Sequence, residues 1–269
     1  MLVVVKVGGR LLEKEFISTI ALDAKAVSEA NRLILVHGGG REVTEVERKL
    51  GRQPRFIVSP DGFRSRYTDR ETVEIYAMVM AGKLNKQVVA TLQSKNVNAI
   101  GLSGLDGRLL IAERKKRLVI INERGRKMVI DGGYTGRIVE TNRDLLNQLL
   151  DSGYVPVIAP MAMSKEYEPL NVDGDRTAAS VAGALNADLL ILLTDVEGLA
   201  IDGKAVPNLK LAEAKTLLPK IGPGMITKIH AATEALEQGV AKTVIAPGTN
   251  ASPITSAMNH KVGTVIENA

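Results

Sequence analysis

The sequence predicts an α/β fold with a largely parallel central sheet. Short apolar runs bounded by Gly, Pro, Asn or Asp have the pattern of buried strands. They occupy residues 2–7, 32–36, 99–102, 154–159, 189–193 and 243–246. Longer segments with helical patterns alternate with them, at residues 69–94, 142–151, 175–186 and 225–238. This alternation is typical of parallel strands joined by right-handed helical crossovers.

One segment, residues 108–130, departs from the alternation. Strand-like runs at 109–112 and 118–121, with 128–130 beyond, are joined by polar turns, which predicts a β-hairpin excursion from the main sheet. The formal net charge of +5 is concentrated there. Between Glu113 and Lys127 the segment carries seven basic and two acidic residues, and the rest of the chain balances. The hairpin is therefore expected to present a basic patch that suits an acidic partner.

Composition places the chain among ordinary globular proteins. At 269 residues and 45% hydrophobic, it suits one large domain or two tightly joined lobes. With no cysteine and three scattered histidines, neither a disulfide framework nor a metal site is expected. Lys6 interrupts the first apolar run, which argues against a signal peptide or membrane span and favours a cytoplasmic protein. The basic hairpin lacks interleaved aromatic residues, so nucleic-acid binding is disfavoured.

Glycine turns follow the first two predicted strands. Residues 6–9 read Lys-Val-Gly-Gly, and residues 37–40 read His-Gly-Gly-Gly. Both turns fall at the carboxyl edge of a parallel sheet, where open α/β sheets bind ligands, and glycines let backbone N–H groups approach an anion. Neither is a Walker A or dinucleotide motif, and each alone would be an ordinary tight turn. Together, and with Lys6 on the first, they predict anion binding, whereas His37 is expected to be structural.

The second half of the chain supplies matching polar groups. Asp175 stands just before the helical segment, where it would cap the helix or position other groups. Residues 194–198, Thr-Asp-Val-Glu-Gly, end a strand with acids and a glycine. Lys228 follows a Gly-Pro-Gly turn at 222–224 and is well placed to point at a phosphate.

In this order, the motifs resemble the amino-acid kinase family, most closely acetylglutamate kinase and its relatives that act on carrier proteins. The resemblance spans nearly the whole chain. It implies a three-layer sandwich with an eight-stranded, mainly parallel sheet, and a homodimer. It also implies an N-terminal lobe, 1–174, for the acidic substrate and the basic hairpin, and a C-terminal lobe, 175–269, for ATP, within one compact domain.

The resemblance also implies roles for individual residues. Lys6 and Lys228 would stabilise the transferring phosphoryl group, and Asp175 would organise both ammonium groups. A carboxylate nucleophile is already deprotonated near neutral pH, so no general base is needed, and Mg²⁺ would arrive with ATP. The substrate would contact Gly39, Gly40, Arg66 and Asn171. The nucleotide would be bordered by Gly8, Gly9, Asp195, Gly198, Lys220, Gly222 and Met225.

Two departures from acetylglutamate kinase bear on the substrate. An additional arginine, Arg64, precedes Arg66, and Asp173-Gly174 stands where that enzyme has Asn-Ala. Both features resemble the kinases of lysine and arginine biosynthesis that act on 2-aminoadipate or glutamate attached to an acidic amino-group carrier protein. Acetylglutamate kinase and a non-catalytic nucleotide-binding or oxyanion-binding relative stay open as alternatives. The expected carrier-docking residues are Arg64, Arg114, Lys115, Lys116 and Arg117.

Overall fold

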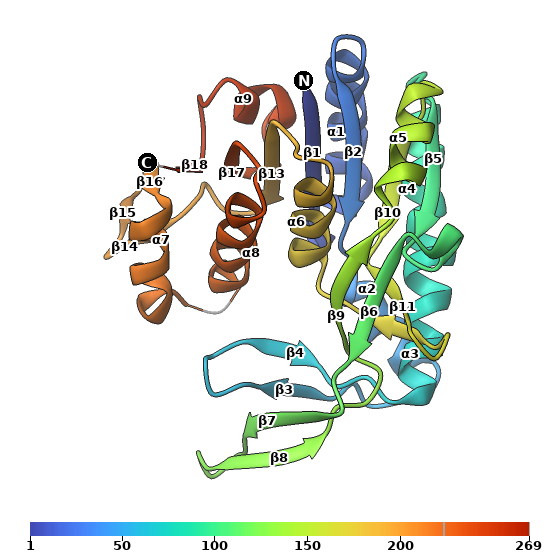
Figure 1. Ribbon diagram of the computed structural model, residues 1–269, viewed down its shortest axis with the longest axis vertical. Coiled ribbons are helices and arrows are strands. Elements are labelled where there is room, and N and C mark those ends of the chain that lie inside the picture. Colours follow the sequence, from blue (N-terminus) through green and yellow to red (C-terminus); the bar gives the residue numbers. More distant parts are fainter. Residues whose placement is uncertain (223, 269) are drawn as a thin grey trace.

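The computed structural model describes residues 1–222 and 224–268, except for the side chain of Lys220. An eight-stranded sheet lies at the centre, with the order β16-β18-β17-β13-β1-β2-β10-β5 (Figure 1). Neighbouring strands are parallel except for β17 and β18. All six predicted strands are confirmed, and β16 and β18 are additional. The bounds are β1 Leu2–Val7, β2 Arg32–His37, β5 Ala99–Ser103, β10 Val155–Ala159, β13 Leu189–Thr194, β16 Asn208–Lys210, β17 Lys242–Pro247 and β18 Thr264–Glu267.

Helices cover both faces of this sheet, which confirms the three-layer sandwich. Successive residues of a strand point to opposite faces, so Val3 and Val5 pack on one helical layer while Val4 packs on the other. The first layer contains α1 (Lys14–Ser28), α4 (Asn85–Gln93) and α9 (Pro253–Met258). The second contains α5 (Arg143–Asp151), α6 (Gly174–Ala184), α7 (Leu211–Leu217) and α8 (Met225–Glu237).

The predicted excursion is present and is larger than expected. Strands β6 (Leu110–Arg114) and β9 (Gly136–Thr141) pair antiparallel within a second sheet, which also holds β11 (Met161–Ser164) and β12 (Pro169–Asn171). Beyond it, β7 (Arg117–Ile121) and β8 (Lys127–Asp131) form a separate hairpin. A hairpin that was not predicted, β3 (Phe56–Val58) with β4 (Arg64–Arg66), lies beside β7. Figure 1 shows both hairpins at the same end of the molecule, away from the central sheet.

The predicted helix at 69–94 is continuous but changes its winding. It begins as α3 (Arg70–Ala77), where the Asp69 side chain accepts a hydrogen bond from the N–H of Thr72. It then passes through a π-helical segment, η2 (Met78–Leu84), into α4. Met80 and Leu84 of that segment lie against Gly39, the residue before α2 (Gly40–Lys49). A side chain at Gly39 would collide with both, and its φ of +150° is one that other residues rarely adopt.

The two glycine turns meet at the carboxyl edge of the central sheet. The last residues of β1 and β2, Val7 and His37, are paired in register, so the turns that follow them are neighbours. A Cβ atom on Gly38 would lie 2.9 Å from the backbone nitrogen of Gly9. The turns therefore pack backbone against backbone, which only glycine permits here.

The remaining elements are short. They are the 3-10 helices η1 (Gly9–Leu12), η3 (Asp106–Arg108) and η4 (Leu218–Lys220), and the paired strands β14 (Ala200–Ile201) and β15 (Lys204–Ala205). None of the helices in the described part of the chain combines the length and the apolar character needed to cross a membrane.

Candidate active site

A carboxylate held between two lysines lies at this edge of the sheet. The Nζ of Lys6, on β1, is 2.7 Å from Oδ1 of Asp175, and the Nζ of Lys228, on α8, is 3.1 Å from Oδ2. Lys6 and Asp175 are 7% and 5% exposed. Three elements far apart in sequence, β1, α6 and α8, therefore bring together the residues predicted to form the reaction centre.

Burial and charge oppose each other in this group. Burial raises the pKa of Asp175, but the two ammonium groups outweigh it, so the pKa of Asp175 is lowered. Burial also works against the Lys6 ammonium, yet Asp175 more than compensates and the pKa of Lys6 is raised. Burial and repulsion by Lys6 together lower the pKa of Lys228. Asp175 is thus ionised near neutral pH and compensates part of the charge of both lysines.

The start of α6 fixes the position of Asp175. Asp173 is the N-cap residue, and its side chain accepts a hydrogen bond of 2.9 Å from the N–H of Arg176. Burial and the neighbouring Asp175 raise the pKa of Asp173, so these two carboxylates differ in their tendency to ionise. The sequence left open whether Asp175 caps the helix or positions other groups; the cap is Asp173, and Asp175 pairs with the two lysines.

His37 supports the second glycine turn. Its Nδ1 lies 2.8 Å from the carbonyl oxygen of Gly38, and its Nε2 lies 3.3 Å from Nδ2 of Asn85. An amide nitrogen can only donate, so Nε2 accepts and Nδ1 carries the proton that bonds Gly38. Burial lowers the pKa of His37 to about 4, which keeps the ring neutral. These contacts agree with the expected structural role.

The reaction centre opens into a cleft of about 1030 Å³. Its walls come from the glycine turns, both hairpins, the β6–β9 sheet, and helices α6 and α8. The cleft brings together many of the residues predicted from the sequence: Lys6, Gly9, Gly39, Gly40, Arg64, Arg66, Lys115, Asn171 and Asp175.

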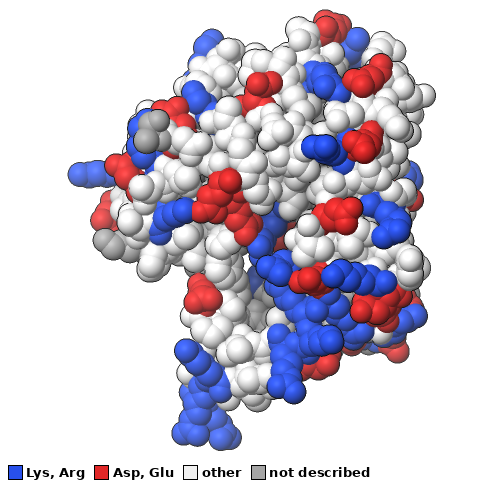
Figure 2. Space-filling model, in the orientation of Figure 1, with Lys and Arg blue, Asp and Glu red and all other residues white. Residues whose placement is uncertain are grey.

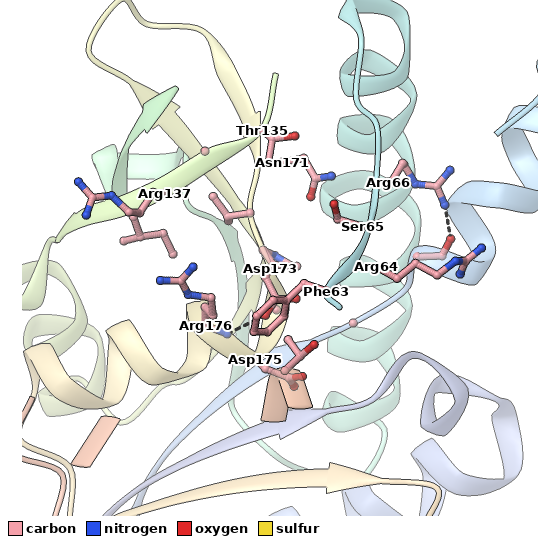
Figure 3. Close-up of a pocket in the computed structure, with 18 of the residues that line it drawn as sticks. Phe63, Arg64, Ser65, Arg66, Thr135, Arg137, Asn171, Asp173, Asp175 and Arg176 are labelled. Atoms are coloured by element: carbon pink, nitrogen blue, oxygen red, sulfur yellow. Dashed lines mark hydrogen bonds between the residues drawn. The ribbon is translucent and has the colours of Figure 1, made fainter. Parts of the chain in front are cut away.

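Arg66, which was predicted to contact the substrate, bonds to groups of the protein itself. Its guanidinium forms a buried ion pair with Glu47 and donates to the carbonyl oxygen of Gly40 at 2.7 Å and to the Thr44 hydroxyl at 2.5 Å. Figure 3 shows Arg64 and Arg66 on the opposite side of β4 from Ser65, which lies near Asn171. A substrate clamp at Arg66 therefore stays a prediction that would use its remaining N–H groups.

Asn171 is better placed for contact with a substrate. Its Nδ2 donates to the Thr68 hydroxyl at 2.9 Å, and no described protein group bonds to its Oδ1. Figure 3 shows the amide near the middle of the cleft, above Asp173.

The residues predicted to dock a carrier are in different environments. Arg114 is half-buried, forms an ion pair with Glu168 at 3.0 Å and stacks on Tyr134. Lys115 lines the cleft and is half-buried, whereas Lys116 and Arg117 are exposed. Arg64 is also exposed, and its guanidinium lies 4.0 Å from the centre of the Phe56 ring. Arg64, Lys116 and Arg117 therefore resemble the free surface charges that were expected.

The predicted nucleotide-binding residues differ in their position and in the contacts that they make. Gly9 lines the cleft, but the N–H of Gly8 already donates to the carbonyl oxygen of Leu193 at 3.1 Å. Asp195 forms an ion pair with Arg10 at 2.5 Å. Gly198 is in a backbone conformation with φ of +141°. Gly222 is exposed, Met225 begins α8, and the side chain of Lys220 lies outside the described residues.

Other cleft residues gave no usable signal in the sequence. Arg176 donates to both carboxylate oxygens of Glu234, at 2.8 and 2.5 Å, which joins α6 to α8. Phe63, in the β3–β4 hairpin, lies edge-on to the His230 ring of α8, with ring centroids 5.5 Å apart. Arg137 of β9 lies on the same side of the cleft as Arg176 (Figure 3). Only the three-dimensional fold reveals that these residues share one cavity.

Comparison with known proteins agrees with this geometry. A family model described as the amino acid kinase family matches residues 1–247. A [LysW]-aminoadipate/[LysW]-glutamate kinase from Saccharolobus solfataricus is 46% identical over 268 residues, which cover 99% of this chain and 100% of that protein. A Nitrosopumilus maritimus protein, provisionally named for the same two activities, is 53% identical over 266 residues, 99% of each chain.

Solved structures share the same fold. N-acetylglutamate synthase from Neisseria gonorrhoeae, complexed with coenzyme A and N-acetyl-glutamate, superposes with a TM-score of 0.83 at 26% identity. All of this chain is matched, but it spans only 59% of that protein. A Giardia carbamate kinase superposes over 100% of this chain and 99% of its own, with a TM-score of 0.68 at 16% identity, which shows likeness of fold alone. By family match, sequence identity and fold, the chain belongs to the amino acid kinase family.

Proposed function

We propose that the protein is an ATP-dependent kinase that phosphorylates the side-chain carboxylate of 2-aminoadipate or glutamate attached to an acidic amino-group carrier protein. The product would be an acyl phosphate in lysine biosynthesis, or in arginine biosynthesis where glutamate is the substrate. The observation that carries the proposal is the Lys6–Asp175–Lys228 group, buried beside two glycine turns at the end of a cleft.

This group suits phosphoryl transfer to a carboxylate. An oxygen of the ionised substrate carboxylate attacks the γ-phosphorus and forms a new O–P bond. The bond to the bridging oxygen breaks, and ADP leaves with the electron pair. Lys6 and Lys228 would neutralise charge on the equatorial oxygens, and the N–H of Gly9 would add a backbone donor. Mg²⁺ would come with ATP as part of the substrate.

Asp175 would act as a positioning residue in this mechanism. Two buried ammonium groups repel each other, and a single shared carboxylate lets both point at the same place. The reaction needs no general base, because the nucleophile is already ionised near neutral pH.

The choice of substrate rests on the relatives and on surface charge. The two relatives described above carry names for kinases of [LysW]-aminoadipate and [LysW]-glutamate. Figure 2 shows basic side chains gathered at the end of the molecule that carries the β3–β4 and β7–β8 hairpins. Lys116 and Arg117 are exposed in that region, between Lys115 and Leu118, which line the cleft. This position supports docking of an acidic carrier beside the cleft.

We further propose that residues 1–174 hold the acidic substrate and residues 175–269 hold ATP. Strand β1 pairs with both β2 and β13, so a single sheet passes through the two parts, and they would act as one unit. We also propose a homodimer, which the family resemblance implies, and a cytoplasmic location, which the composition and the interrupted first apolar run favour.

A hydroxamate assay tests the proposed function. Hydroxylamine traps an acyl phosphate, so the purified enzyme is given MgATP with carrier-borne 2-aminoadipate, carrier-borne glutamate, free 2-aminoadipate or acetylglutamate. We expect ATP-dependent hydroxamate with the carrier-borne substrates. Efficient turnover of acetylglutamate, without activity on carrier-borne substrates, would favour acetylglutamate kinase. No ATP-dependent turnover with any of them would favour a non-catalytic role.

A further inference from the structure

We propose that Lys115, flanked by Arg137 and Arg176, forms a second anion site in the cleft, separate from the reaction centre. Its ligand is a carboxylate on the acyl group that is bonded to the substrate's amino group, on the carrier side of that amide. The inference rests on the proposed function and specifies how the linking part of the substrate is bound.

Of these three basic residues, Lys115 is the one whose ammonium group is available to bind an anion. It is half-buried in the cleft wall, and no carboxylate among the described residues lies within 4 Å of its ammonium. Burial lowers the pKa of Lys115, and the charges of Arg176 and Arg137 lower it further, while the more distant carboxylates of Asp173 and Glu234 offset only part of this effect. A half-buried cation without a close counter-charge is stabilised when an anion binds.

The two arginines add positive charge but are already occupied. Arg176 donates to both oxygens of Glu234, and Arg137 forms an ion pair with Glu113 at 2.9 Å. They would therefore raise the local potential and orient the ligand, while Lys115 supplies the direct contact. In Figure 3, Arg137 and Arg176 lie on one side of the cleft and Arg64 and Arg66 on the other, with Asn171 and Asp173 between them.

The position of Lys115 favours a carboxylate from the carrier side over a phosphate. Lys115 follows β6 and directly precedes the exposed Lys116 and Arg117, so it lies between the outer hairpin surface and the reaction centre. A substrate that enters from the hairpins would pass it before reaching Lys6. The phosphoryl group already has Lys6 and Lys228.

The test uses the whole enzyme and two ligands that differ by one charge. One is 2-aminoadipate acylated on its amino group with succinate, and the other carries an amide in place of the terminal succinyl carboxylate. Calorimetry with a non-hydrolysable ATP analogue present measures both affinities. We expect the wild type to bind the carboxylate form about tenfold more tightly, the scale of one charge-assisted hydrogen bond.

Variants of Lys115 test whether this residue causes the tighter binding of the carboxylate ligand. Lys115→Ala should abolish it, and so should Lys115→Met, which keeps most of the apolar stem and guards against misfolding. Lys115→Arg should retain most of the preference. Lys261→Ala removes an exposed lysine outside the cleft and should bind both ligands as the wild type does. Thermal melting checks that each variant folds.

Three results would overturn the anion site. The first is equal affinity of the wild type for the two ligands, or no binding of either. The second is a preference that survives both Lys115→Ala and Lys115→Met. The third is weaker binding of the ATP analogue to these variants with the preference intact, which would assign Lys115 to a phosphate. Hydroxamate formation on carrier-borne substrates is scored separately, so the anion site can fail while the proposed function stands.

Discussion

The reaction centre and the basic hairpins differ in how the fold holds them. Lys6 and Asp175 are buried, and they lie on a central strand and at the start of a helix packed on the sheet. Lys116 and Arg117 are exposed, at the start of a two-stranded hairpin outside both larger sheets. The packing of the core holds the reaction centre in position, whereas residues of the hairpin can be substituted with little effect on the stability of that core.

Under the proposed function, this difference would separate chemistry from recognition. A largely buried triad at strand and helix ends is fixed by the same packing that stabilises the fold, so it suits the phosphoryl-transfer step. Hairpins away from the core tolerate substitution and insertion, and they suit the part of the site that distinguishes one substrate from another. Substitutions in the two regions test this division.

Removing either lysine should break the reaction centre. Lys6→Ala and Lys228→Ala should each lower kcat by about 10² or more, the usual scale for losing one preorganised donor, while substrate KM changes much less. Asp175→Asn should also lower kcat with the fold intact. Gly174→Ala is the matched control in the same turn, because its added Cβ would make only ordinary contacts, 3.6 Å or more from its neighbours. A normal kcat in a folded lysine variant would contradict the assignment.

The second glycine turn should become less stable in acid because of His37. Its pKa is about 4 in the folded protein and near 6.5 when exposed, so the unfolded state takes up the proton first. Stability from the neutral ring is present above pH 6.5, is lost progressively as the pH falls toward 4, and levels off below that.

His37→Asn measures this contribution. Asn keeps an N–H donor close to the position of Nδ1 but does not titrate. Chemical denaturation at pH 7 and pH 4 should show that the wild type loses roughly 3 kcal/mol more unfolding free energy than the variant over this range. Equal losses in the two proteins would mean that His37 does not resist protonation.

Arg66 lies at the boundary between the two regions. Arg66→Lys should raise substrate KM about tenfold, because an ammonium lacks the planar fork that binds a carboxylate, and the KM for ATP should hold. Arg64→Lys, two residues earlier on the same strand, is the comparison and should do less. If Arg66 only anchors β4 to Glu47, its variant will melt at a lower temperature with an unchanged KM.

The exposed pair should have the smallest effect. Lys116→Gln with Arg117→Gln should raise KM for a carrier-borne substrate severalfold at low salt and flatten its salt dependence, because exposed charges are screened beyond about 8 Å at physiological ionic strength. Turnover at saturation should stay the same. An unchanged KM across salt concentrations would remove this surface from carrier docking.

Much of the fold follows from local pattern, because buried parallel strands such as Leu2–Val7 are continuous apolar runs. Strand β18 was not predicted, because Thr264 and Glu267 at its two ends leave only two apolar residues in a row. The π-helical winding of Met78–Leu84 was not predicted either, because the sequence pattern there is that of an ordinary helix and does not reveal that Met80 and Leu84 pack against Gly39.

The sequence predicted those site residues whose role depends on their chemical type. It did not predict which side chains contact one another in the folded protein. Lys6, Asp175 and Lys228 stood out as charges beside glycine turns, and the fold brings them together. The ion pair of Arg66, on β4, with Glu47, 19 residues earlier on α2, could not be inferred from spacing. Nor could the chain order show that Lys115 and Arg176 face the same cavity.

The position of β1 has a consequence for synthesis of the protein. Strand β1 is an inner strand of the sheet, and one of its two neighbours, β13, is synthesised much later. The bond from the Leu2 N–H to the Asp188 carboxylate joins residues 186 apart. At roughly 5–20 residues per second, β1 waits on the order of 10–40 s with that edge unpaired. We expect the nascent chain to depend on chaperones during this interval, and the enzyme to be inactive until α8 has emerged.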